Sequence, residues 1–246
     1  MDAQQDARVA IVTGGSGGIG SAVAERLAAD GMSVLVHFAG SSERADQVVK
    51  SITAAGGTAL AAGGDIADEA AMTALFGEAE RHFGGVDVVV NTAGIMLLSP
   101  LAKLGLADLD RMHRINIRGT FVVSQLAARK LRPGGALVNF STAQTRLQSP
   151  GYAAYAASKA AVEAMTLVLA RELRGRDITV NAIAPGPTGT PLFLEGKSDE
   201  LVAQIAQAAP LGRLGTPADI AEAVAFLTGP GRWVNGQVVF ADGGIA

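Results

Sequence analysis

Short apolar runs alternate with segments of helical periodicity along the whole chain. Residues 9–13 form an apolar, β-branched run, and Ile19, Val23 and Leu27 then recur at helical spacing before Gly31. Strands that are apolar throughout are buried on both faces, and strands that are separated by helices run parallel within one sheet. The alternation therefore predicts an α/β chain with a doubly wound parallel sheet of about seven strands and helices on both of its faces.

The same pattern sets the expected boundaries of the later elements. Strands are predicted at residues 33–38, 58–62, 86–90, 136–141, 178–183 and 238–240, and helices at 68–83, 107–130, 152–173, 199–208 and 217–227. Because no repeat or low-complexity linker interrupts this series, residues 1–246 are predicted to form a single domain. The long irregular stretch at 185–195 is either a lid over a site or a surface loop, and residues 187–212 are the expected substrate-loop region.

Composition excludes several classes of protein. The 246 residues contain no cysteine, so a disulfide framework, a thiolate nucleophile and a cysteine metal site are excluded. The three histidines form no metal-binding motif, and the net charge of -3 does not suggest a nucleic-acid partner. The first residues lack the pattern of a signal peptide, and no uninterrupted apolar run reaches membrane-spanning length, so we expect a cytoplasmic protein without a membrane partner.

A glycine-rich turn, TGGSGGIG at residues 13–20, lies between the first predicted strand and the first predicted helix. Glycines let a backbone approach a pyrophosphate closely, and a helix N-terminus offers free N–H groups to the anion. Two spacings fit the turn equally well: one uses Gly15 and Gly17 before Gly20, and the other uses Gly14 and Gly18 before Gly20. The placement of the turn predicts a dinucleotide-binding Rossmann fold.

The end of the second predicted strand bears on which dinucleotide binds. An acid in this region usually holds the ribose 2′-hydroxyl of NAD, but residues 37–42 read HFAGSS and contain none. A site without that carboxylate can accept a 2′-phosphate, with Ser41, Ser42 and Arg44 as possible partners. The alternative is that these residues only form a polar turn. We therefore favour NADP(H) over NAD(H).

Tyr155 and Lys159 lie four residues apart in a predicted helix and share one of its faces. A cation beside a phenol lowers its pKa, so the pair can give a proton to a carbonyl oxygen or take one from an alcohol. Tyr152 has no lysine four residues on, and we expect it to pack or to line a substrate pocket. Taken alone, the Tyr–Lys spacing also occurs by chance on many helices.

Taken together, these motifs resemble those of the short-chain dehydrogenase/reductase family from Val9 to Gly244. The resemblance implies catalytic roles for Asn116, Thr142, Tyr155 and Lys159, with Asn116 in a proton relay. In addition to Ser41 and Ser42 above, it implies cofactor contacts from Gly14, Ser16, Gly18, Ile19, Gly20, Asp65, Ile66, Asn91, Ala93, Gly94, Tyr155, Lys159, Pro185, Gly186, Thr188 and Thr190.

Three positions depart from the family's pattern. Thr92 replaces an asparagine, and Gly17 stands where many NADP-dependent relatives carry a basic residue, which weakens the NADP(H) preference. Thr142 stands where the family usually has a serine that hydrogen-bonds the substrate carbonyl. Its hydroxyl can still polarise a carbonyl, although the alternative is that Thr142 only packs. Neighbouring strand residues point to opposite sides, so Ser141 is not expected to share the role.

The resemblance implies an oxidoreductase that transfers a hydride between NADP(H) and a carbonyl or alcohol, as ketone and 3-oxoacyl-carrier-protein reductases do. The alternative is a cofactor-binding sensor or interaction protein with weak or no catalysis. Residues 192–194 are expected either to cover the pocket or to pack in the core. The family usually forms tetramers through two long helices, here 107–130 and 152–173, although the apolar face through Val162, Met165, Leu169 and Leu173 could equally be core. No metal is expected.

Overall fold

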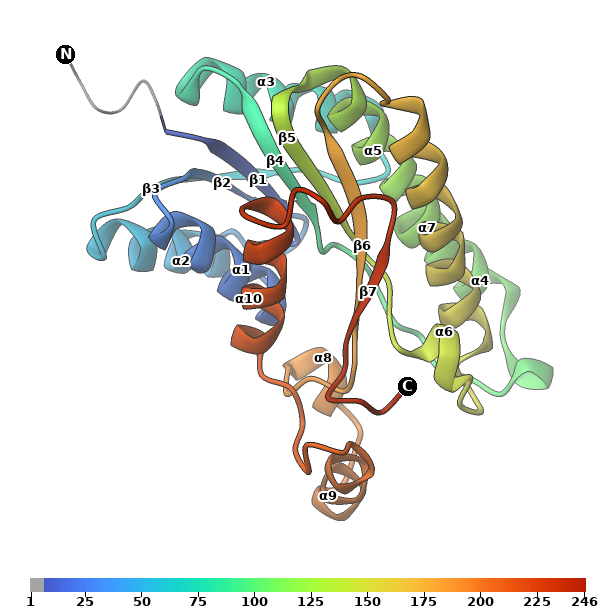
Figure 1. Cartoon of the computed structure of the whole chain (residues 1–246). Helices are drawn as coiled ribbons and strands as arrows, with labels where there is room; N and C mark the ends of the chain where they lie inside the picture. The colour runs from blue at the N-terminus through green and yellow to red at the C-terminus, as the bar shows by residue number, and fades with distance from the viewer. Residues whose placement is uncertain (1–6) are drawn as a thin grey trace.

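The computed structural model describes residues 7–246 and contains one seven-stranded sheet in which every neighbouring pair is parallel (Figure 1). The order of its strands is β3-β2-β1-β4-β5-β6-β7. Their bounds are Val9–Thr13 (β1), Ser33–Phe38 (β2), Thr58–Gly63 (β3), Val86–Asn91 (β4), Leu131–Phe140 (β5), Thr179–Pro185 (β6) and Val238–Ala241 (β7). The predicted doubly wound sheet is confirmed.

Helices cover both faces of the sheet and bury two separate apolar layers (Figure 1). One face carries α1 (Gly18–Ala29), α2 (Ser42–Ala54) and α10 (Pro217–Thr228). The other carries α3 (Glu69–Phe83), α5 (Gly119–Lys130) and α7 (Ala153–Glu172). β1 and β4 are buried along their whole length, as expected of central strands between two helical layers.

Local signals in the sequence account for several helix ends. Asp68 caps α3 by accepting hydrogen bonds from the backbone N–H groups of Ala70 and Ala71. Thr216 and Asp219 form a reciprocal capping box that begins α10. Gly84 ends α3 in the left-handed conformation, with φ of 87°.

The helix predicted at 107–130 is interrupted in the structure. It comprises α4 (Leu106–Met112), a π-helical segment at His113–Arg118 and α5. A π segment inserts extra backbone into a helix, and such segments are frequent at functional sites. Here it contains Asn116, whose side chain is wholly buried. Hydrophobic periodicity did not predict the interruption because the apolar face continues through it.

Shorter elements complete the chain. They are a 3₁₀ turn at Leu101–Lys103, α6 (Gln144–Leu147), α8 (Pro191–Leu194) and α9 (Asp199–Ala208). The stretch at 185–195 is therefore not wholly irregular, because the Thr190 side chain caps α8 by accepting from the N–H of Phe193. α9 has the predicted bounds.

Helix α7 is the one described helix that is long and apolar enough to cross a membrane. It packs against β6 and β5, and it carries the buried Lys159 and the half-buried Glu163 beside the carboxyl end of β5. We interpret α7 as a helix that packs on the sheet, because its polar residues Ser158, Lys159 and Thr166 are buried within the protein.

Strand order reverses between β1 and β4, because β2 follows β1 on one side of this pair and β5 follows β4 on the other. In open α/β sheets, ligands bind outside the carboxyl ends of the strands at such a switch point. We therefore expect the site among the loops that follow β1, β4, β5 and β6.

Candidate active site

The glycine-rich turn after β1 is packed too tightly for side chains at most of its positions. Gly14 has φ of 64°, and a Cβ there would lie 2.8 Å from Thr92 Oγ1. A Cβ on Gly20 would collide with the carbonyl oxygen of Gly14, and one on Gly18 would lie 3.0 Å from Thr190 Cγ2. Gly17 is less constrained, with its nearest neighbour at 3.3 Å. The structure therefore favours the spacing of Gly14, Gly18 and Gly20.

The same turn presents the N-terminus of α1 at the switch point. Gly17 is the N-cap residue and offers no side chain to the first helical N–H groups. Free N–H groups and the positive end of the helix dipole suit an anion, and the closely approaching glycine backbone leaves room for a pyrophosphate. The residues present therefore fit a dinucleotide.

His37 joins three of the loops around this end of the site, a role the sequence analysis missed. Its Nδ1 accepts from the N–H of Gly14 at 3.2 Å, and its Nε2 donates to the carbonyl of Gly64 at 2.9 Å. Its own carbonyl accepts from the N–H of Gly15. Burial lowers the pKa of His37, which keeps the ring neutral and Nδ1 free to accept. His37 is a positioning residue for the glycine-rich turn.

Ser41 and Ser42 lie where β2 passes into α2. The Ser41 hydroxyl accepts from the N–H of Arg44 at 3.3 Å and donates to Glu43 Oε2 at 2.8 Å. The hydrogen bond from Ser41 lowers the pKa of the exposed Glu43 carboxyl. A 2′-phosphate at this position would have to replace Glu43 as the acceptor of the Ser41 hydroxyl.

Asp65 and Ile66 follow β3 and occupy different environments. The Asp65 carboxylate accepts from Arg114 at 2.6 Å and from the N–H of Ala67 at 2.9 Å, and the hydrogen bond from Arg114 is the main reason that the pKa of Asp65 is lowered. The side chain of Ile66 is buried against Gly119 of α5. The Asp65 side chain is exposed, whereas the buried Ile66 could reach a cofactor only through its backbone.

The side chain of Asn91 lies beneath the site, so a contact of Asn91 with the cofactor would have to come from its backbone. Only 1% exposed, the side chain accepts from Thr13 Oγ1 at 2.7 Å and donates to Thr120 Oγ1 and Asn139 Oδ1, each at 3.2 Å. All of its polar atoms are used within this buried network. Asn91 therefore positions the loop that contains Ala93 and Gly94. Ala93 packs against the sheet, and its N–H lies 3.4 Å from Thr13 Oγ1.

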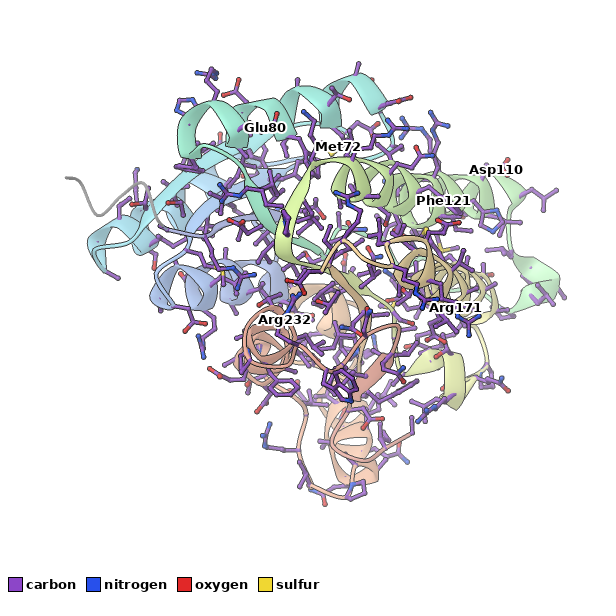
Figure 2. The ribbon with its side chains drawn as sticks, turned by 45° about the horizontal axis from the view of Figure 1, so that its top comes forward. Met72, Glu80, Asp110, Phe121, Arg171 and Arg232 are labelled. Carbon is purple, nitrogen blue, oxygen red and sulfur yellow. The ribbon has the colours of Figure 1, made fainter. Side chains whose placement is uncertain are left out.

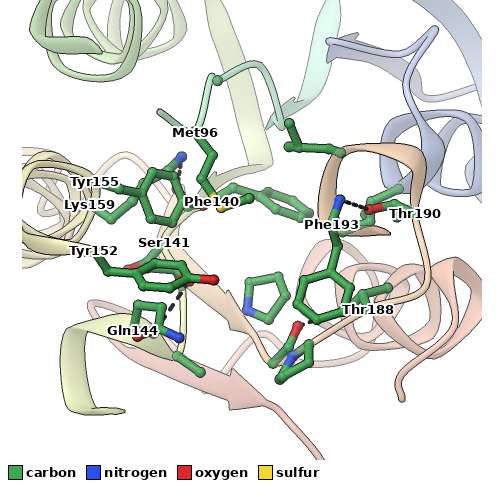
Figure 3. Close-up of a pocket in the computed structure, with 18 of the residues that line it drawn as sticks. Met96, Phe140, Ser141, Gln144, Tyr152, Tyr155, Lys159, Thr188, Thr190 and Phe193 are labelled. Carbon is green, nitrogen blue, oxygen red and sulfur yellow. Dashed lines mark hydrogen bonds between the residues drawn. The ribbon is translucent and has the colours of Figure 1, made fainter. Parts of the chain in front are cut away.

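One cavity brings together residues from α1 and from the segments that follow β4, β5 and β6 (Figure 3). Its lining joins Ile19 at the glycine-rich turn to the reactive groups on β5 and α7 and to the segment after β6. The predicted site residues that line it are Ile19, Gly94, Thr142, Tyr155, Lys159, Pro185, Gly186, Thr188 and Thr190. Ser16 lies in the glycine-rich turn, outside this cavity.

Thr142 and Tyr155 both line the cavity, with the Thr142 hydroxyl close enough to the Tyr155 phenol to influence its pKa. Thr142 Oγ1 accepts from the N–H of Gln144 at 3.3 Å. The hydroxyl of Ser141 is bonded elsewhere, to Glu163 Oε1 at 2.5 Å. The expectation that Ser141 and Thr142 do not share one role therefore agrees with the geometry. Two hydroxyl groups, from Thr142 and Tyr155, can address the same substrate oxygen.

The pKa of Tyr155 differs from the expected direction. Burial raises it to about 12, while the hydrogen bond with Thr142 opposes that rise. Lys159 does not lower it, because the Lys159 ammonium is turned to the carbonyl of Phe140 at 2.8 Å. Burial also lowers the pKa of Lys159 to about 8. The Tyr155 phenol is therefore held protonated at neutral pH, the state in which it can act as a proton donor.

Glu163 is a second positioning residue that the sequence analysis missed. Its Oε1 accepts from Ser141 at 2.5 Å and from Thr145 Oγ1 at 2.8 Å. These two hydroxyls flank Thr142, and Thr145 Oγ1 also donates to the Thr142 carbonyl at 3.0 Å. One carboxylate of α7 thus holds the loop that carries Thr142.

Asn116 ties the π segment to the loop after β4. Its amide donates to the carbonyl of Ile95 at 2.9 Å and to Ser158 Oγ at 3.0 Å, and its Oδ1 accepts from the N–H of Ile95 at 2.9 Å. A Cβ on Gly94 would lie 3.2 Å from both Asn116 Oδ1 and Lys159 Nζ. Asn116 therefore lies next to Lys159, while its amide group is already engaged.

The segment after β6 closes one side of the cavity. A Cβ on Gly186 would lie 2.6 Å from Asp242 Cα, so this glycine permits a close approach to the C-terminal strand. Thr188 Oγ1 donates to the carbonyl of Gly186 at 2.9 Å. Leu192 and Phe193 line the cavity, which favours the lid interpretation for these two residues, whereas Leu194 does not line it. Within residues 7–246 no cluster of side chains suits a metal ion.

Comparison with known proteins agrees with this geometry. The family model described as enoyl-(acyl carrier protein) reductase matches residues 14–246. A "short-chain type dehydrogenase/reductase" of Picea abies is 40% identical, with 96% of this chain and 92% of the relative covered. The chain belongs to the short-chain dehydrogenase/reductase family. It is accordingly an NAD(P)-dependent oxidoreductase.

Other relatives bear on the cofactor. An Arabidopsis thaliana protein described as an NADPH-dependent aldehyde reductase-like protein, chloroplastic, is 39% identical over 96% of this chain and 93% of its own length. A Burkholderia cenocepacia short-chain dehydrogenase solved with NADP superimposes with a TM-score of 0.90 at 40% identity, with 97% of each chain covered. These neighbours support the predicted preference for NADP(H).

Proposed function

We propose that this short-chain dehydrogenase/reductase transfers a hydride from NADPH to a ketone or aldehyde and protonates the resulting oxygen through Tyr155. The observation that carries the proposal is that Thr142, Tyr155 and Lys159 line one cavity, where the hydroxyl groups of Thr142 and Tyr155 lie near each other. Two hydroxyl groups directed at one point suit a substrate oxygen, and so favour a carbonyl over a carbon–carbon double bond as the reacting group.

The glycine-rich turn and the N-terminus of α1 would hold the pyrophosphate, and Gly94 and the segment from Pro185 to Thr190 would enclose the nicotinamide end. Bound NADPH would supply the hydride to the carbonyl carbon. Ser41, Ser42 and Arg44 would bind the 2′-phosphate.

The protein's own contribution is position and protonation. The Thr142 hydroxyl donates to the carbonyl oxygen and polarises the C=O bond. Tyr155, protonated because burial raises its pKa to about 12, gives its proton to that oxygen as negative charge develops there. Lys159 lies one helical turn after Tyr155 in α7, and its ammonium group supplies the proton that restores the Tyr155 phenol. Asn116 would hold a water in this relay through its backbone, since its amide is engaged.

We propose a class of substrates and not one particular compound. The cavity is lined largely by apolar side chains on its outer side, among them Met96, Leu147 and Phe193. This lining suits ketones with an apolar body, and 3-oxoacyl thioesters belong to the same range. Residues 187–212 would form the substrate loop over them.

We also propose that the chain assembles as a homotetramer in the cytoplasm. A groove between α5 and α7 is lined by apolar and small residues, with Phe121 47% and Val168 54% exposed. Phe121 and Arg171 mark these two helices in Figure 2. Exposed apolar patches of this kind are typical of protein interfaces.

Transfer of label from NADPH tests the catalytic proposal. With NADPH deuterated at the transferred position, wild-type protein should place deuterium on the carbinol carbon of a reduced ketone, and NADH should support slower turnover. A matched incubation without protein controls for chemical reduction. Tight NADPH binding without label transfer to any ketone or 3-oxoacyl thioester would instead favour a cofactor-binding sensor.

A further inference from the structure

The hydroxyl group of Tyr152 points into the substrate side of the cavity (Figure 3). Its ring meets that of Tyr155 edge to face, with the ring centroids 6.4 Å apart and the planes at 63°. Burial alone raises the pKa of Tyr152, and no hydrogen bond from the described residues offsets that rise. This phenol therefore lies beside the reacting group without a polar partner in the protein.

Gln144 lines the same side of the cavity, just below Tyr152 in Figure 3. Its side-chain oxygen accepts from the N–H of Ser149 at 3.1 Å, which fixes the orientation of the carboxamide. The acceptor atom of Gln144 is thus used by the protein, and its NH₂ group is the part left to meet a ligand. Tyr152 and Gln144 both offer a donor, so the ligand group that suits both is an oxygen acceptor.

Apolar side chains surround the two donor groups of Tyr152 and Gln144. Met96, Leu147, Leu192 and Phe193 supply apolar surface to the same cavity. A hydroxyl or amide in an apolar cavity is costly unless it is hydrogen-bonded, and packing against Tyr155 requires only the ring of Tyr152. A phenylalanine would pack equally well, so the hydroxyl indicates a contact with a bound molecule.

We propose that Tyr152 and Gln144 form a second polar contact for the substrate, separate from the contact of Thr142 and Tyr155 with the reacting carbonyl. The preferred substrates are then carbonyl compounds whose apolar body carries another oxygen, as a hydroxyl or a second carbonyl. This inference rests on the proposed carbonyl reduction and adds the feature by which the cavity selects among carbonyl compounds.

Cyclohexanone and its 2-, 3- and 4-hydroxy derivatives test the inference, because they share one ring and differ in the position of a single oxygen. The readout is the ratio of kcat/KM for each hydroxyketone to kcat/KM for cyclohexanone, with NADPH saturating. Wild-type protein should prefer at least one hydroxyketone, and Tyr152→Phe should lower that ratio by about fivefold to tenfold, the effect of one lost hydrogen bond. Gln144→Leu should lower the same ratio.

Leu101→Met is the control, since Leu101 lies outside the cavity and the substitution removes no donor, so the ratio should be unaltered. Melting temperature and NADPH affinity report whether each variant is folded. A ratio that is unchanged in both Tyr152→Phe and Gln144→Leu would overturn the inference. Loss of turnover by Tyr152→Phe on every ketone, cyclohexanone included, would overturn it too, because Tyr152 would then act on the reacting carbonyl itself.

Failure of the proposed carbonyl reduction can be distinguished from failure of the second polar contact. If the wild-type protein reduces none of these ketones, carbonyl reduction is contradicted, and ligand recognition is then measured by saturation-transfer NMR with the NADP⁺-loaded protein. Stronger binding of a hydroxyketone than of cyclohexanone, lost in Tyr152→Phe, would support the second contact. Equal binding of all four ketones would overturn it.

Discussion

Thr142 shows at the scale of a single residue how the site tolerates a departure from its family's pattern. Ser141 cannot replace it, because the Ser141 hydroxyl is bonded to Glu163. The Thr142 hydroxyl instead meets Tyr155, and the Thr142 side chain is 8% exposed. The extra methyl group is accommodated while the hydroxyl keeps its place, so the hydroxyl is the part expected to matter for catalysis.

We predict that Thr142→Ser retains activity within about threefold of the wild type, whereas Thr142→Val lowers kcat by about 100-fold because it removes one donor to the developing oxyanion. Steady-state kinetics with NADPH and a ketone measures both. NADPH affinity should be unchanged in either variant, since Thr142 addresses the substrate. Full activity of Thr142→Val would show that Thr142 only packs.

The pKa values of Tyr155 and Lys159 predict the pH dependence of reduction. Tyr155 stays protonated up to a pKa of about 12, while the charged form of Lys159 is lost as pH rises through about 8. Because the charged lysine returns the proton to Tyr155, kcat/KM for reduction should fall above about pH 8. The profile between pH 6 and 10 measures this. Lys159→Arg keeps its charge over that range and should remove the fall, whatever its absolute rate.

At the scale of elements, hydrophobic periodicity was sufficient to predict the seven strands and most of the long helices, the interrupted segment at 107–130 excepted. The bounds of β2 and α9 agree with expectation. What periodicity could not predict depends on contacts between distant segments. The hydrogen bonds of His37 form only once the ends of β1, β2 and β3 lie side by side, and those of Glu163 form only once α7 packs beside the end of β5. The π segment around Asn116 likewise packs against α7. Short helices such as α6 bury too few residues to show a period.

His37 gives a prediction about the loops that bind the cofactor. His37→Leu removes both side-chain hydrogen bonds, leaving Gly14 and Gly64 without those partners, and should weaken NADPH binding by about tenfold. His37→Asn is the matched control, because its oxygen can replace Nδ1 as the acceptor for Gly14, and its affinity should stay within about threefold of the wild type. Fluorescence titration with NADPH measures both, and equal affinities for wild type and His37→Leu would contradict the positioning role.

At the scale of the whole molecule, the sheet divides the protein into two helical layers, and the carboxyl ends of β1, β4, β5 and β6 supply the site. Sequence motifs predicted several of the residues that gather there, because the glycine-rich turn and the segments at Gly94, Thr142 and Pro185 all lie at or after the carboxyl ends of strands. They could not predict which of those side chains reach the cavity, since Asn91 is turned into the core by bonds to residues from β1 and β5.

The groove between α5 and α7 predicts an oligomer in solution. Val168 is 54% exposed in the isolated chain, and Val168→Glu would place a charge within the proposed interface. The substitution should therefore convert the assembly into smaller species. Leu101→Glu, at a position that is 73% exposed in a short 3₁₀ turn, is the control and should leave the assembly unchanged. Light scattering coupled to size exclusion measures both. A wild-type monomer would contradict the proposed assembly.

The proposed role of Tyr155 is to donate the proton during NADPH-dependent carbonyl reduction. The most direct measurement compares wild type with Tyr155→Phe, following single-turnover oxidation of bound NADPH by a ketone together with NADPH affinity. We expect an affinity within about threefold of the wild type and a rate lowered by about 1,000-fold. A Tyr155→Phe variant that binds NADPH normally and oxidises it at the wild-type rate would show that Tyr155 is not the proton donor.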